Sequence, residues 1–186
     1  MWQHNGTTIK EGKGWKDSNG IQHPPNWHIW SVDEKAAAGL VEATPETPPD
    51  SRLYTWGYQA DGVTISKTAK SLTDVGLTDG DGNAVNDDDG NQIMQPGVRS
   101  TLKAEVNTQQ GSLLAQTDWY VIRKADKSTA IPDAVQTHRD AIRAKGDAMK
   151  AAIDDAADTA AVAALFLSWD ADQNKSGILY DWPELS

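Results

Sequence analysis

The helical half of the fold is decided by the stretch Leu113-Leu114-Ala115-Gln116-Thr117-Asp118-Trp119. At helical spacing its apolar residues share one stripe with residues further on, giving the set Leu113, Leu114, Thr117, Val121 and Ile122. Gly111 is expected to interrupt the helix just before this stretch, because glycine is a poor helix former. The stretch therefore predicts the first arm of a helical region that begins after Gly97.

A second helix is predicted after Pro132. Its less polar residues keep an approximate heptad spacing through Val135, His138, Ile142, Met149 and Ala156. The charged residues between them are expected to face outward, namely Arg139, Asp140, Arg143, Lys145 and Asp147. The two arms then form a helical hairpin in which Val121 and Ile122 pack inward with the leucines of the first arm. A third helix, capped by Asp158, is predicted as far as Phe166.

The N-terminal part has the pattern of short strands and tight turns. The dipeptides Asn5-Gly6, Asn19-Gly20 and Asp61-Gly62 suit the positive φ angles of hairpin turns. Alternation in the strand before Asp61-Gly62 places three rings on one face: Tyr54, Trp56 and Tyr58. A short helix is predicted between Ser31 and Gly39, because Ser31 and Glu34 have the spacing of a capping box and Gly39 suits a left-handed stop.

The expected fold class is α+β, with a small Trp-rich β-hairpin domain containing one short helix, followed by an α-helical hairpin or bundle. Five of the eight tryptophans lie in the first 56 residues, which favours a Trp-rich, β-rich docking domain over residues 1–73. Residues 74–97 are rich in Gly, Asp and Asn and are expected to form an acidic loop or linker. Residues 98–168 form the predicted helical domain, and 169–186 a C-terminal tail.

Composition argues against several classes of function. The net charge of −10 repels a phosphate backbone, so no nucleic-acid partner is expected. The sequence has no stretch of about 18 apolar residues, the length that a membrane-spanning helix needs, so membrane insertion is not expected. No leader segment is recognisable at the N-terminus. The chain has no cysteine, which removes thiolate chemistry, and no serine elbow or phosphate loop is present, so neither an enzyme nor a cofactor is expected.

Two acidic segments bear on metal binding. Asp172 to Gly177 copies the first six positions of a calcium-binding EF-hand loop, but Pro183 stands where the bidentate acid belongs. The segment Asp79 to Asn91 has ligand-type residues at Asp79, Asp81 and Asn83 without the required turn glycine, and a loose calcium site there stays open. The four histidines lack the helical pair spacing that zinc sites use, so no metal site is predicted.

Aromatic residues supply the candidate partner-binding positions: Trp27, Trp30, Trp119 and Tyr120. Trp27 and Trp30 flank a histidine and could stack on sugars, although a role in the core is the commoner use of such rings. Trp119 and Tyr120 could close the helical hairpin or face a neighbouring protein. No catalytic residue is predicted.

Three segments in fixed order resemble a known family: the run from Gly111 to Lys124, then Thr129-Ala130-Ile131-Pro132, then His138-Arg139-Asp140-Ala141-Ile142-Arg143. They are similar to the region shared by the phage tail assembly chaperone family and the C-terminal parts of many tail-fibre or baseplate-associated proteins. His138 departs from the pattern, since a tyrosine commonly precedes that arginine. Patches at the front also resemble marine and cyanophage tail proteins, among them Gly20 to Trp27, Lys35 to Leu40, and, at the close, Asp181-Trp182-Pro183.

The resemblance implies a structural component of a bacteriophage tail, in the baseplate, tail tip or fibre attachment. Such a protein is made in the cytoplasm of the bacterial host and resides in the virion, in an oligomeric assembly with other tail, baseplate or fibre proteins. Two alternatives stay open, an assembly chaperone absent from the finished particle and a glycan- or receptor-binding module of a tail fibre. The Trp-rich front favours the virion component, because a folding helper hardly needs a second domain.

Overall fold

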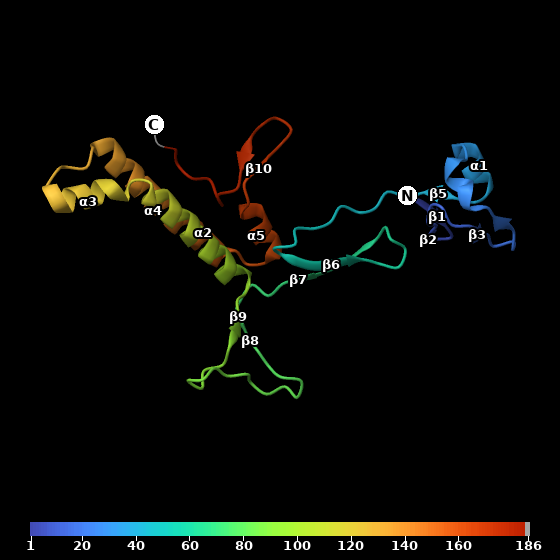
Figure 1. Cartoon of the computed structure of the whole chain (residues 1–186), viewed down its shortest axis with the longest axis horizontal. Helices are drawn as coiled ribbons and strands as arrows, with labels where there is room; N and C mark the ends of the chain where they lie inside the picture. The colour runs from blue at the N-terminus through green and yellow to red at the C-terminus, as the bar shows by residue number, and fades with distance from the viewer. Residues whose placement is uncertain (185–186) are drawn as a thin grey trace. The chain divides into compact units, whose positions relative to one another are not determined.

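The computed structural model describes residues 1–184 and has the expected α+β class, with short antiparallel strands in the N-terminal part and helices in the C-terminal part (Figure 1). The chain divides into two compact units, Met1–Ala69 and a second unit that begins at Lys70.

The first unit is built from very short strands and two small helices. A three-stranded antiparallel sheet has the order β2-β1-β5, and two further hairpins pair β3 with β4 and β6 with β7. The bounds are β1 Trp2–His4, β2 Thr7–Thr8, β3 Trp15–Lys16, β4 Gln22–His23, the 3-10 helix η1 Pro25–Ile29, α1 Val32–Ala37, β5 Val41–Glu42, β6 Tyr54–Tyr58 and β7 Ile65–Ala69.

The three predicted turns and the capped helix are confirmed. Asn5 and Gly6 both have positive φ, 49° and 73°, as the tight turn between β1 and β2 requires. At the β6–β7 turn, Asp61 Oδ1 accepts hydrogen bonds of 2.9 Å from the backbone N–H groups of Val63 and Thr64. Ser31 and Glu34 form the reciprocal capping box of α1.

Tryptophan supplies the core of the first unit. Trp27 is fully buried and Trp15 and Leu40 nearly so, while Trp2 and Trp30 pack against them half-buried. The Trp27 indole N–H donates to the Lys13 carbonyl at 3.0 Å, so its burial leaves no polar group unsatisfied. The aromatic residues at the front are therefore largely used inside the unit.

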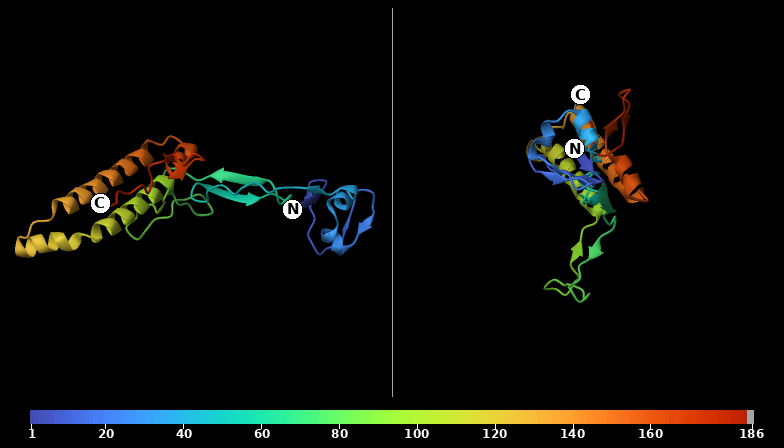
Figure 2. Two further views of the ribbon diagram at one scale, coloured as in Figure 1. Left: turned by 90° about the horizontal axis from the view of Figure 1, so that it is seen from above. Right: turned by 90° about the vertical axis from the view of Figure 1, so that its right-hand side faces the viewer.

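The second unit is a helical hairpin with two strand pairs attached. Helices α2 and α4 lie side by side, and α5 packs on α4 (Figures 1 and 2). The bounds are β8 Val75–Gly76, β9 Met94–Gln95, α2 Val98–Ala115, α3 Asp118–Lys127, α4 Asp133–Asp155, α5 Thr159–Leu165, β10 Ser168–Trp169 and β11 Lys175–Ser176.

The predicted helical hairpin is confirmed, but its break lies elsewhere. Helix α2 runs through Gly111 without interruption, since a single glycine costs a helix only about 1 kcal/mol. The chain leaves helical backbone at Thr117, where φ is −117° and ψ is 6°, and α3 begins at Asp118. The prediction that Val121 and Ile122 pack inward is therefore wrong, because α3 starts a new axis and both side chains are exposed.

Apolar side chains from α2, α4 and α5 make the core of the second unit, with Val162 as the buried residue of α5. From α2 the buried residues are Val98, Leu102 and Val106, and from α4 they include Val135, Ile142, Met149 and Ile153. Gly146 leaves room for the Gln110 side chain, whose amide nitrogen would lie 2.3 Å from a Cβ at that position. Asp158 caps α5 as predicted, by accepting from the Ala161 N–H at 2.8 Å, although Phe166 ends the helix in extended backbone.

The acidic segment between Asp74 and Pro96 is an ordered arm. Leu77, Val85 and Ile93, spaced eight residues apart, form a closed triangle of backbone hydrogen bonds of 2.8 to 3.0 Å. Two loops leave this triangle, and each is closed by an aspartate, Asp79 or Asp87, whose Oδ1 accepts from the N–H groups two and four residues further on. The expected loop or linker thus has fixed backbone pairing.

The base of the arm is attached to the start of α2. The N–H groups of Val98 and Arg99 donate to the carbonyls of Ser71 and Leu72 at 2.9 and 3.1 Å, and Gly97 N–H donates to Asp74 Oδ1 at 2.8 Å. A side chain at position 97 has no room, because a Cβ on Gly97 would lie 2.4 Å from the Thr73 carbonyl.

The C-terminal residues form a small hairpin and then a strap over the helices. Asp170 closes the β10–β11 turn with the same pattern of hydrogen bonds as Asp79, and Gln173 takes the positive φ of 63°. Further on, Leu179 is fully buried, Lys145 pairs with Asp181 at 2.9 Å, and the Trp182 indole donates to Gln109 at 2.7 Å. These contacts hold residues 179–182, the strap, against α2 and α4.

Candidate functional site

The candidate site is the joint between α2 and α3, together with the surface of α3 that this joint presents. At its centre is Arg139 of α4, which is 5% exposed. Its Nη1 donates to the Leu114 carbonyl at 2.8 Å and to Thr117 Oγ1 at 2.7 Å, and its Nη2 pairs with Asp118 at 2.9 Å. The prediction that Arg139 faces outward is therefore wrong.

The chemistry of the joint explains why a charged side chain is buried there. The Leu114 carbonyl at the end of α2 accepts from the backbone N–H and the hydroxyl of Thr117, both at 3.1 Å, and the Arg139 guanidinium adds a charged donor to it. The guanidinium also interacts favourably with the negative end of the helix dipole, while Asp118 stands in the first turn of α3, where a carboxylate is favoured. One arginine thus fixes the end of α2 and the start of α3.

The sequence carries a signal for Arg139 that the approximate heptad missed. The buried positions of α4 follow a strict alternation of four and three residues: Val135, Arg139, Ile142, Gly146, Met149 and Ile153. This spacing places Arg139 and Gly146 in the seam of the hairpin, whereas His138 lies beside it and is half-buried.

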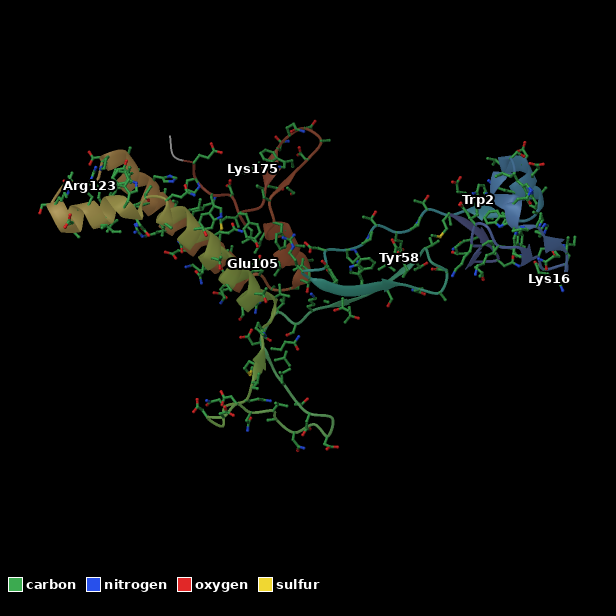
Figure 3. All side chains as sticks on the ribbon, in the orientation of Figure 1. Trp2, Lys16, Tyr58, Glu105, Arg123 and Lys175 are labelled. Carbon is green, nitrogen blue, oxygen red and sulfur yellow. The ribbon has the colours of Figure 1, made fainter. Side chains whose placement is uncertain are left out.

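Helix α3 presents an apolar and aromatic surface to solvent. None of its ten residues, all of which the structure describes, is buried. Trp119 is 50% and Ile122 67% exposed, and Val121 is also exposed. The Trp119 and Tyr120 rings lie 3.7 Å apart, and the Arg123 guanidinium lies about 5 Å from both. Figure 3 shows Arg123 on α3 at the far end of the hairpin.

The other two candidate residues lie in the first unit and have little accessible surface. Trp27 has no exposed ring face, and Trp30 packs against the same core, with its ring 5.7 Å from the His23 ring in an edge arrangement. Trp27 therefore cannot stack on a sugar without unfolding its surroundings. The structure brings Trp119 and Tyr120 together on α3 and leaves them accessible. Trp27 and Trp30 belong to the first unit and do not join them.

The acidic loops use their aspartates to close turns. A side-chain and a backbone hydrogen bond from Asn174 lower the pKa of Asp170, and hydrogen bonds from Asn83 lower the pKa of Asp79. Within residues 1–184, no group of three or more acidic or histidine side chains is arranged to hold a metal ion. The EF-hand-like stretch Asp172 to Gly177 is split between the β10–β11 turn and β11.

Among the described helices, none has the length and apolarity needed to cross a bilayer.

The joint and the α3 surface combine two residues predicted from the sequence, Trp119 and Tyr120, with a buried residue that positions their helix, Arg139. Comparison with models of protein families, with curated proteins and with solved structures gives no match to this chain.

Proposed function

We propose that the chain is a non-enzymatic structural component of a bacteriophage tail that acts by protein–protein docking through α3. It would occupy the baseplate, tail tip or fibre attachment of the virion, with other tail proteins as its partners. The resemblance supplies the identity of the assembly, and the α3 surface supplies a means of docking.

One observation carries the proposal: segments that resemble tail proteins contribute to a single joint. Leu114, Thr117 and Asp118 belong to the first segment and Arg139 to the third, and they are linked by direct hydrogen bonds. These hydrogen bonds span 21 to 25 positions of the chain and hold α3 on the hairpin.

The composition of the α3 surface suits a docking role. Tryptophan, tyrosine and arginine are enriched at protein interfaces and dominate their binding energy. In α3 these residue types stand next to an exposed isoleucine, on a helix that a buried arginine holds in place. Such a surface is preorganised, which lowers the ordering cost of binding.

Mass spectrometry of purified phage particles tests the role. Abundant peptides from this chain in the particle are expected. Their absence, together with recovery of the chain bound to a fibre protein in the infected cell, would contradict the proposal and support the assembly-chaperone alternative.

A pair of matched variants tests the surface. Ile122→Ser is expected to reduce incorporation into particles, whereas Ile29→Ser, which changes a similarly exposed isoleucine of the first unit (72% against 67%), is expected to leave it unchanged. Equal incorporation of both variants into particles would show that α3 is not the docking surface.

A further inference from the structure

A second exposed apolar surface lies on the arm. Val75, Leu77, Ile93 and Met94 are 38 to 49% exposed, although they belong to paired backbone at its base. Residues 74–96 contain six aspartates and no lysine or arginine, so the arm carries a charge of −6. An ordered segment that exposes apolar side chains and one sign of charge has the properties of a docking element.

Helix α3 has the complementary properties. Asp118 is engaged with Arg139, and the remaining charges of α3 are Arg123, Lys124, Lys127 and Asp126, a local sum of +2 in a chain of net −10. In the sequence, Ile122 of α3 directly precedes Arg123 and Lys124, and Leu77 of the arm stands two residues before Asp79. Apolar contact and opposite charge therefore favour the same pairing.

The arm and α3 of one chain cannot meet. The arm is attached by hydrogen bonds to the first residues of α2, and α3 follows the last, so the 18 residues of α2 separate them by about 27 Å at 1.5 Å per residue. Figure 1 shows β8 and β9 leaving α2 at the end opposite to α3. The arm and α3 can therefore pair only with the complementary surface of another molecule.

We infer that copies of this chain associate head to tail, with the acidic arm of one copy docked on α3 of the next. The inference rests on the docking role proposed above for α3 and names a second copy as the partner. A contact between two different surfaces of one chain generates a ring where its rotation closes and a filament where it does not. Trp119 and Ile122 would anchor the contact, and Lys124 and Lys127 would meet the aspartates of the arm.

Exchanging charges between the two surfaces of the full chain tests this contact, and sedimentation velocity measures the association. Lys124→Glu/Lys127→Glu changes the local charge of α3 from +2 to −2, and Asp88→Lys/Asp89→Lys changes the charge of the arm's loop from Asp87 to Asn91 from −3 to +1. These side chains are exposed, and the turn-closing carboxylates of Asp79 and Asp87 are left in place. Each variant alone is expected to associate at least tenfold more weakly than the wild type, and an equimolar mixture of the two is expected to regain association.

Lys10→Glu/Lys13→Glu is the matched control, because it makes the same change of charge at exposed positions of the first unit. It is expected to associate like the wild type. A wild-type chain that stays monomeric at its highest soluble concentration, or variants that associate unchanged, would overturn the inference. Neither result affects detection of the chain in phage particles, so the two proposals fail separately.

Discussion

Helix α4 buries six residues along one seam. Helix α3, which is separated from α4 by five residues, buries none of its ten residues, all of which the structure describes. Both helices carry apolar and charged residues on separate faces. The apolar face of α4 lies against α2, while that of α3 meets solvent. An amphipathic pattern therefore predicts that one face of a helix will be buried. It does not predict whether that face packs against the same chain or against another molecule.

Arg139 marks the boundary between the two kinds of helix. It belongs to the buried seam of α4, and its guanidinium binds the end of α2 and the start of α3. The direction in which α3 leaves the hairpin is thus set from inside the core. Substitutions in the buried seam of α4, at Arg139 and on the exposed surface of α3 therefore test the difference between the two helices.

The largest effect on stability is expected from a substitution in the buried seam of α4. Ile142→Ala removes a fully buried side chain from the seam and is expected to lower the free energy of unfolding by about 2–5 kcal/mol. Denaturant unfolding followed by helical circular dichroism measures this loss. A loss below that of an exposed substitution would mean that the α2–α4 seam is not the core of the unit.

Arg139→Ala is expected to cost about 2–3 kcal/mol, because it leaves the Leu114 carbonyl and the Thr117 hydroxyl without their charged donor. Arg139→Lys keeps the charge but loses the fork that reaches both groups, so it should recover only part of the loss. Arg143→Ala is the control, since its pair with Asp140 is solvent-exposed and worth less than about 1 kcal/mol. Equal effects at the two arginines would contradict the proposed joint.

The same contrast shows how far the sequence predicts this fold. Turn dipeptides, caps and the helical hairpin were all predictable, because they depend on local backbone preferences and apolar periodicity. The exposure of Val121 and Ile122 was not, because their stripe continues across Thr117 in sequence while the helix axis does not. Trp119 and Tyr120 were found as candidates, but Arg139 was missed, since an arginine in a buried seam is satisfied by groups 21 to 25 positions away.

A smaller effect is expected at the strap, which covers α2 and α4. Hydrogen bonds from Lys175 and then Lys145 lower the pKa of Asp181 below its ordinary 3.8. Asp181 therefore stabilises the strap above that pH, and the stabilisation is lost as pH falls through the lowered pKa. The indole N–H signal of Trp182, which is bonded to Gln109, should report release of the strap in acid by NMR.

Asp181→Asn is the reference for that titration. Asparagine stays neutral, so the variant should show a looser strap at neutral pH and less change in acid, whereas Asp147→Asn, at an exposed pair on α4, should behave like the wild type. An unchanged acid response in Asp181→Asn would assign the pH dependence to other carboxylates.

The smallest effect on stability is expected on the exposed side. Ile122→Ser changes a side chain that is 67% exposed, and surface substitutions of this kind usually shift the free energy of unfolding by less than about 0.5 kcal/mol. Its association with a second copy is nevertheless expected to weaken, because the apolar contact with the arm is lost. Ile142→Ala should show the reverse pattern, with lower stability but the same association wherever the chain stays folded. If Ile122→Ser destabilised the hairpin as Ile142→Ala does, α3 would belong to the core, and the distinction between the two helices would be lost.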